Sequence, residues 1–372
     1  NKKNKSADKS IITVTRRIAG FMADAANEAI IMYNEKLLEH DQLTAGKEGG
    51  RLSSIIKELK LNRLWDGIAI EADIAPMKRL RDIHDANFLN ELHKRAYSGL
   101  EKLDPKTPLI KESFEIARFG AGGVLDAVDK IMSGEAKRAF CLTAMPGHHS
   151  GITSTGYGSL VNPMAAGAHY LTKKFGKKRV AILDLDAEHG SGTQEIFYHR
   201  KDVLTISIHE YPGTTGTGHY EEMGGKGALG YNLNIPFASG YGDREYRVCL
   251  KEIIEKILTQ FMPEFIIVGF GTNVLNSDPS SHLIVSEAGL VNTFSLVMNM
   301  SEKFCDGKII SVLEGGTPGN LMAKTTSQHV RLLVNKIAGP VDKVKKEELI
   351  SYADWYGYAK LLKAQFKKIW KL

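Results

Sequence analysis

The chain has 372 residues and a formal net charge of +6, and 43% of its residues are hydrophobic while 25% are charged. This composition is ordinary for a soluble globular protein and excludes collagen-like, low-complexity and highly charged disordered chains. Three cysteines without Cys-x-x-Cys spacing, a polar start and no apolar run of membrane-spanning length predict a cytoplasmic protein without a disulfide framework or a membrane span.

Residues 1–10 are polar and carry Lys2, Lys3, Lys5 and Lys9, which predicts a flexible basic tail at 1–12 ahead of a single domain at 13–340. No zinc-finger or RNA-binding motif accompanies these lysines, so no specific nucleic-acid partner is expected. Helical stripes follow at 51–64 and 76–97. His84 and Asp85 fall within the second of these stretches. They can reach a site from a loop, or Asp85 can cap a helix beside a surface histidine.

From residue 113 onward, the chain repeats the order strand, polar loop, helix. Expected strands are 139–143, 180–183, 204–209, 231–236, 265–270 and 308–313, and expected helices are 113–133, 162–175, 246–262 and 287–304. This alternation predicts an α/β fold with a parallel sheet, and ligands bind at the carboxyl ends of the strands in such sheets.

Two polar clusters follow expected strands directly. Asp184 and Asp186 share one face of their strand, and two like charges there require a cation or a donor network. A metal is the simplest explanation, and carboxylates that cap the next helix through the glycine turn at 190–193 are the alternative. His148 and His149 follow strand 139–143, where an imidazole pair suits general acid–base chemistry.

Five motifs occur in an order that resembles the histone deacetylase and acetylpolyamine amidohydrolase superfamily. They are Pro146-Gly147-His148-His149, Asp184-x-Asp186-x-Glu188-His189-Gly190, Asn232-x-Asn234-x-Pro236, Asn273 ahead of Asp278-Pro279, and Leu313-Glu314-Gly315-Gly316. The resemblance covers roughly residues 30–335. It implies a three-layer arginase/deacetylase-like fold around a central, mostly parallel sheet of about eight strands.

The resemblance also assigns site residues, and several of these positions depart from the family pattern. The catalytic zinc ligands match Asp186, Glu188 and Asn273, so an acid replaces the family's histidine and an amide replaces its second aspartate. The catalytic tyrosine matches Thr317, and the residue that orients the second histidine matches Ser191. His148, His149 and His189 match the family's catalytic histidines, and Asp184 with Ser207 matches a structural potassium site.

The altered ligands still sum to a formal charge of about −2, but all three now offer oxygen. Such a set favours Mg, Mn or Ca over zinc, and the alternative is that the side chains satisfy one another without a metal. Two functions follow. One is a metal-dependent deacylase or amidohydrolase of small acylated substrates or acyl-lysine proteins, with little zinc-type acetyl-lysine deacetylation. The other is a pseudoenzyme that keeps the fold for binding or assembly, and either function allows a homo-oligomer.

Residues 341–372 are expected to form an amphipathic helical extension docked on the domain. Leu362, Phe366, Ile369 and Trp370 fall on one helical face, and lysines occupy much of the remainder. The alternative is an anchor for an acidic partner or an anionic membrane surface.

Overall fold

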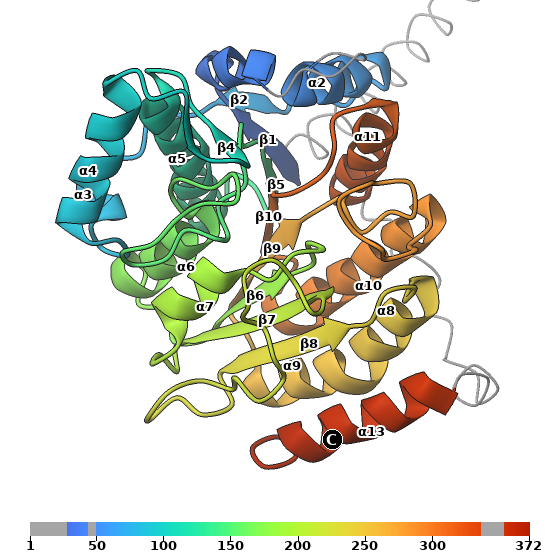
Figure 1. The fold of residues 1–372 in the computed structure, drawn as a ribbon. Helices are drawn as coiled ribbons and strands as arrows, with labels where there is room; N and C mark the ends of the chain where they lie inside the picture. Colours follow the sequence, from blue (N-terminus) through green and yellow to red (C-terminus); the bar gives the residue numbers. More distant parts are fainter. Residues whose placement is uncertain (1–27, 44–49, 336–352) are drawn as a thin grey trace, which may run out of the picture.

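The computed structural model describes residues 28–43, 50–335 and 353–372. An eight-stranded sheet lies at its centre in the order β2-β1-β5-β10-β9-β6-β7-β8, and every neighbouring pair is parallel (Figure 1). The strands are β1 (Ala29–Tyr33), β2 (Ala69–Glu71), β5 (Arg138–Cys141), β6 (Val180–Asp184), β7 (Val203–Glu210), β8 (Asn232–Phe237), β9 (Phe265–Phe270) and β10 (Ile309–Leu313). The expected three-layer fold is therefore confirmed, with a sheet that is wholly parallel.

Helices cover both faces of the sheet, with α5, α6 and α7 on one side and α10 and α11 on the other (Figure 1). The helices are α2 (Arg51–Leu61), α3 (Met77–Leu80), α4 (Ala86–Tyr97), α5 (Ser113–Ser133), α6 (Pro163–Lys174), α7 (Ser191–Phe197), α8 (Asp243–Cys249), α9 (Glu255–Phe261), α10 (Glu287–Cys305), α11 (Asn320–Asn335) and α13 (Ala353–Phe366). Every residue of β6 and β9 is buried, which explains their nearly continuous apolar sequences.

The structure subdivides two of the predicted helices. The stripe at 76–97 is α3 and α4 separated by a turn, and the stripe at 246–262 includes a π-helical stretch, η2 (Leu250–Ile254), between α8 and α9. The sequence patterns did not single out β1, β2, the 3-10 helix η1 (Glu35–Leu43) or the small antiparallel hairpin of β3 (Lys102–Asp104) and β4 (Thr107–Pro108). The predicted tail at 1–12 and the domain boundary at 340 lie outside the described residues.

Asp85 is the N-cap of α4, and its Oδ1 accepts the backbone N–H groups of Asn87 and Phe88 at 2.8 and 3.0 Å. His84 is not a surface residue, since it is only 2% exposed. Its Nδ1 lies 2.6 Å from the carbonyl oxygen of Gly151, and its Nε2 accepts the N–H of Asn162. The two residues thus have separate roles: Asp85 starts a helix, and His84 joins the turn between α3 and α4 to the loop after β5.

Asp85→Ala is expected to lower the free energy of unfolding by about 1 kcal/mol, because two N–H groups at the start of α4 lose their acceptor. Asn90→Ala is a matched control on an exposed position of the same helix and should be neutral within about 0.5 kcal/mol. Urea denaturation of both variants checks this. Equal stability of the two variants would contradict a capping role for Asp85.

The C-terminal helix α13 lies beside β8, the edge strand of the sheet (Figure 1). Leu362, Phe366 and Trp370 are buried, whereas Ile369 is 40% exposed. The Trp370 indole N–H donates to the carbonyl oxygen of Gly230 at 2.9 Å. Covering an edge strand in this way protects it from pairing with other chains. Among the described residues, no helix combines the length and the apolar character needed to cross a membrane.

Candidate functional site

The polar residues singled out in the sequence follow five strands that are adjacent in the sheet, β5, β10, β9, β6 and β7. Parallel strands present their carboxyl ends at the same edge, so loops that are far apart in sequence meet there. The residues in these loops are His148 and His149 after β5, Glu314 to Thr317 after β10, Asn273 after β9, Asp186 to His189 after β6 and Thr214 after β7.

Asp186 and Asn273 form the floor of the site, and both are almost fully buried. The Asn273 amide nitrogen donates to Asp186 Oδ1 at 2.7 Å, while the amide oxygen accepts the N–H of Ala187 at 3.1 Å. Asp186 also accepts the N–H groups of Glu188 at 2.9 Å and of Gly315 at 2.6 Å. Flipping the amide would oppose donor to donor and acceptor to acceptor, so these contacts set its orientation.

Glu188 turns away from this floor toward a lysine that is distant in sequence. Its Oε1 lies 3.0 Å from Lys106 Nζ and accepts the Thr214 hydroxyl at 2.9 Å, and its Oε2 lies 3.4 Å from His149 Nε2. Burial favours the neutral acid, but the contacts with His149 and Lys106 outweigh it and hold the pKa of Glu188 below its usual value. Glu188 is therefore a charged carboxylate paired with an ammonium group.

The two histidines differ in charge because their neighbours differ. Burial alone would lower the pKa of His148, but the carboxylates of Asp184 and Asp186 raise it to about 10, and Asp184 Oδ2 lies 2.9 Å from its Nδ1. Burial and the charge of His148 lower the pKa of His149 to about 4. A neutral His149 that faces Glu188 carries its proton on Nε2, which leaves the basic lone pair on a buried Nδ1 without a partner among the described residues.

Glu314 supports the backbone of the loop after β5, which carries His148 and His149. Its Oε2 accepts the N–H groups of Gly147 at 2.7 Å and of His148 at 3.2 Å. Burial raises the pKa of this carboxyl to about 7, against the opposing effect of His148. The resemblance covered Glu314 as part of a motif, and the structure gives its carboxylate this supporting role.

The remaining predicted residues lie around the site without joining its floor. Asp184 and Ser207 face one another across the β6–β7 pair, and the Ser207 hydroxyl contacts His209 Nδ1 at 2.8 Å. His189 contacts the Thr217 hydroxyl at 2.8 Å, and burial together with His209 lowers its pKa. His189 is therefore neutral and held by the loop after β7.

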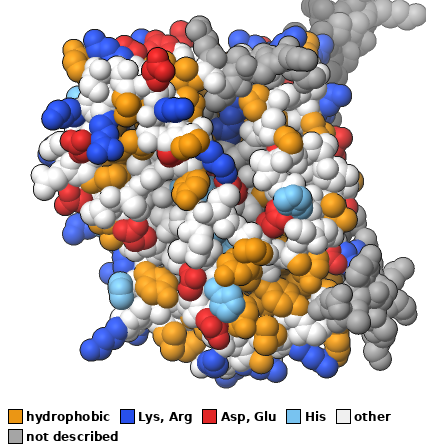
Figure 2. Space-filling view, in the orientation of Figure 1, with side chains coloured by type: hydrophobic (Ala, Val, Ile, Leu, Met, Phe, Trp, Pro, Cys, Tyr) orange, Lys and Arg blue, Asp and Glu red, His pale blue; other side chains and the backbone are white. Residues whose placement is uncertain are grey.

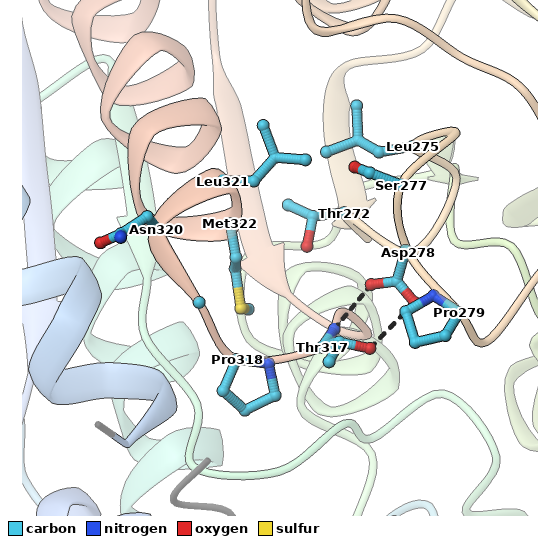
Figure 3. A pocket seen from close by; sticks show the side chains of 11 residues that line it. Thr272, Leu275, Ser277, Asp278, Pro279, Thr317, Pro318, Asn320, Leu321 and Met322 are labelled. Atoms are coloured by element: carbon cyan, nitrogen blue, oxygen red, sulfur yellow. Dashed lines mark hydrogen bonds between the residues drawn. The ribbon is translucent and has the colours of Figure 1, made fainter. Parts of the chain in front are cut away.

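Thr317 lines a separate pocket (Figure 3). Its hydroxyl donates to Asp278 Oδ1 at 2.9 Å, and its N–H donates to Asp278 Oδ2 at 2.7 Å. The pocket has a volume of about 330 Å³ and lies between the loop after β9 and the start of α11. The Thr317 hydroxyl is thus engaged as a donor to Asp278.

The donor set does not fit a zinc ion. Zinc sites need three side-chain ligands with free nitrogen, sulfur or oxygen lone pairs around one point. Here Asn273 presents an N–H to Asp186, its oxygen is bound to Ala187, and Glu188 is paired with Lys106. Within the described ranges, no group of three or more His, Cys, Asp or Glu side chains is arranged to hold an ion.

The sequence patterns did not single out Lys106 and Thr214, which contact Glu188, or Tyr157, which contacts both of them. Tyr157 donates its hydroxyl to the carbonyl oxygen of Thr214 at 3.2 Å, and its ring lies 5.8 Å from Lys106 Nζ. Lys106 is 82 positions from Glu188. No local sequence pattern indicated that Lys106 belongs to the site.

A second hollow occurs on the same face, where Figure 2 shows hydrophobic side chains gathered in the lower right part of the molecule, near β8 and α13. Its volume is about 170 Å³. It is lined by Tyr211, His219, Tyr220, Pro236, Phe237, Ala238, Tyr241 and Tyr358. This is smaller than the roughly 300–1,000 Å³ of ordinary small-molecule sites, so the hollow does not compete with the strand-end site.

Comparison with protein families matches residues 47–333 to the histone deacetylase domain. A probable deacetylase of Archaeoglobus fulgidus is 34% identical over 291 residues, which are 77% of this chain and 80% of that protein. Histone deacetylase 15 of Arabidopsis thaliana is 28% identical over 88% of this chain and 60% of its own length.

Two further matches agree with these. A histone deacetylase-like amidohydrolase of Pseudomonas aeruginosa is 32% identical over 63% of this chain and 62% of its own length. The crystal structure of the HDA15 HD domain superposes with a TM-score of 0.80 at 26% identity and covers 93% of this chain and 96% of that one. The chain thus spans less than two thirds of the Arabidopsis and Pseudomonas proteins.

Proposed function

The chain belongs to the histone deacetylase family, and we propose that it is a member that binds a ligand in the deacetylase pocket without hydrolysing it. The observation that carries this proposal is the hydrogen bond from the Asn273 amide nitrogen to Asp186 at 2.7 Å. It places a donor where the family's zinc requires an acceptor. The side chain at a second ligand position, Glu188, contacts Lys106 Nζ at 3.0 Å.

The position of the proton on His149 supports the same proposal. A general base must direct its lone pair toward the attacking water. His149 instead directs Nε2 toward the Glu188 carboxylate, which requires a proton on that nitrogen. Thr317 supplies no oxyanion donor, because its hydroxyl is bound to Asp278. Losing one such donor typically slows a reaction by a factor of about 10²–10³.

A hydrolase that uses Mg, Mn or Ca is the second candidate. The retained His148–Asp184 pair favours it, since a charged and a neutral histidine side by side suit proton transfer. A structural potassium ion at Asp184 and Ser207 is compatible with either function and remains a proposal, and so does the acylated substrate of the hydrolase.

We expect protein purified without added metal to retain no zinc. We also expect it to hydrolyse acetyl-lysine peptides and acetylpolyamines at least about a thousandfold more slowly than an active family member assayed alongside. Elemental analysis, metal titration and the two assays check this. Stoichiometric manganese or magnesium with metal-dependent turnover would establish the second candidate instead. Robust turnover that is abolished by His149→Ala would refute the binding role.

A further inference from the structure

Lys106 places an ammonium group inside the remodelled site. It lies in the turn between β3 and β4, and its Nζ is 3.0 Å from Glu188 Oε1. Asp104 holds the turn by accepting the N–H of Lys106 at 2.8 Å and the Thr107 hydroxyl at 2.7 Å. The turn is thereby fixed, while the lysine side chain extends from it to Glu188.

The residues around this ammonium group come from three different loops, and together they favour a positive charge. Glu188 supplies a carboxylate, and Thr214 orients it through a hydroxyl at 2.9 Å. Tyr157 presents its ring 5.8 Å from Lys106 Nζ, within the range of a cation–π contact. A carboxylate together with an aromatic face recognises a cation, whereas an acetamide is neutral and gains nothing from the charge.

The ion pair that holds the Lys106 ammonium group beside Glu188 is weak. Its side chain is 50% exposed and that of Glu188 is 23% exposed, so solvent reaches the ion pair. Exposed ion pairs of this kind contribute little to stability because water and salt screen them. An ammonium group from another molecule can therefore replace Lys106 at the cost of a weak contact.

We propose that the pocket binds a primary ammonium group on an alkyl chain, as carried by an unacylated lysine or a polyamine, in the place that Lys106 Nζ now occupies. This inference rests on the proposed binding function and names its ligand class. The site then binds the free amine that a deacetylation releases, rather than the acetylated substrate. Lys106 competes with the ligand from within the chain and lowers its apparent affinity.

Calorimetric titration of the full chain with pentylamine and with N-pentylacetamide tests the proposal. Lys106→Met should bind pentylamine about five- to tenfold more tightly than the wild-type protein, because the internal competitor is removed. Lys102→Met is the matched control, since Lys102 is exposed on the same hairpin and has no contact with Glu188 among those described, and it should match the wild type. N-pentylacetamide should bind at least about tenfold more weakly than pentylamine to Lys106→Met.

Adding Glu188→Gln to Lys106→Met should abolish the preference for the amine, because the amide keeps the shape and removes the charge. Thermal melting of each variant verifies that it is folded. Repeating the titration with cadaverine and with a peptide containing one lysine separates a polyamine ligand from a protein ligand. Tighter binding of the peptide indicates a protein lysine, and tighter binding of cadaverine indicates a polyamine.

Equal binding of amine and amide, or no gain in Lys106→Met over Lys102→Met, would overturn the ammonium inference and leave the lack of hydrolysis untouched. Turnover of acetyl-lysine by the wild-type protein would instead overturn the proposed function. The two failures are thus distinguishable.

Discussion

Replacing Glu188→His and Asn273→Asp together is expected to tighten zinc binding at least about a hundredfold, because both altered ligands are restored at once. The first change supplies an imidazole nitrogen and releases Lys106. The second removes the amide N–H that faces Asp186 and returns a carboxylate. The formal charge of the three side chains stays at about −2, so the double substitution does not add buried charge to the site. Zinc titration with a competing chelator measures the effect.

Each single substitution should achieve much less. Glu188→His alone leaves the Asn273 amide donating to Asp186. Asn273→Asp alone places another carboxylate beside the buried Asp186, and like charges there repel. Glu221→His with Asn276→Asp changes the same residue types at exposed positions and is the matched control. A double variant that binds zinc no better than this control would contradict the structural explanation.

Zinc alone should not restore turnover, because Thr317 remains bound to Asp278. Thr317→Tyr in the otherwise unchanged protein should also be inactive. Combining all three substitutions is expected to give measurable deacetylation, since an oxyanion donor contributes a factor of about 10²–10³.

Deleting residues 358–372 is expected to lower the melting temperature by at least roughly 10 °C or to make the protein insoluble. The deleted segment carries Leu362, Phe366 and Trp370, which are buried against the domain. Trp370 packs its ring on Tyr231 and Phe261, with ring centroids 5.9 and 6.5 Å apart. Removing these side chains exposes the apolar surface beside β8 to water.

Point variants distinguish packing from other effects of the deletion. Phe366→Ala should cost about 3–5 kcal/mol of unfolding free energy, because Phe366 is fully buried. Leu361→Ala is the matched control on the same helix, where Leu361 is 45% exposed, and should cost less than about 0.5 kcal/mol. An unchanged melting temperature after deletion, together with lost salt-sensitive binding to anionic vesicles, would favour the anchor over the docked helix.

The sequence by itself determined the architecture and the place of the site. Apolar runs such as 180–183 and 265–270 are buried on both faces and could be recognised as central strands, because their pattern depends only on local burial. The polar residues after each run marked the carboxyl ends of the strands. The helix at 113–133 was predicted with its observed bounds. The family resemblance then predicted the positions at which the zinc ligands differ.

Only the tertiary structure decided what those positions do. Glu188 and Lys106 are 82 residues apart, and their pairing depends on where the β3–β4 hairpin lies against the loop after β6. Asn273 presents its amide nitrogen to Asp186 because its amide oxygen accepts the N–H of Ala187, an orientation set by the loops after β6 and β9 together. Local sequence patterns encode burial and backbone conformation, whereas the partner of a polar side chain depends on the distances between loops that only the folded chain brings together.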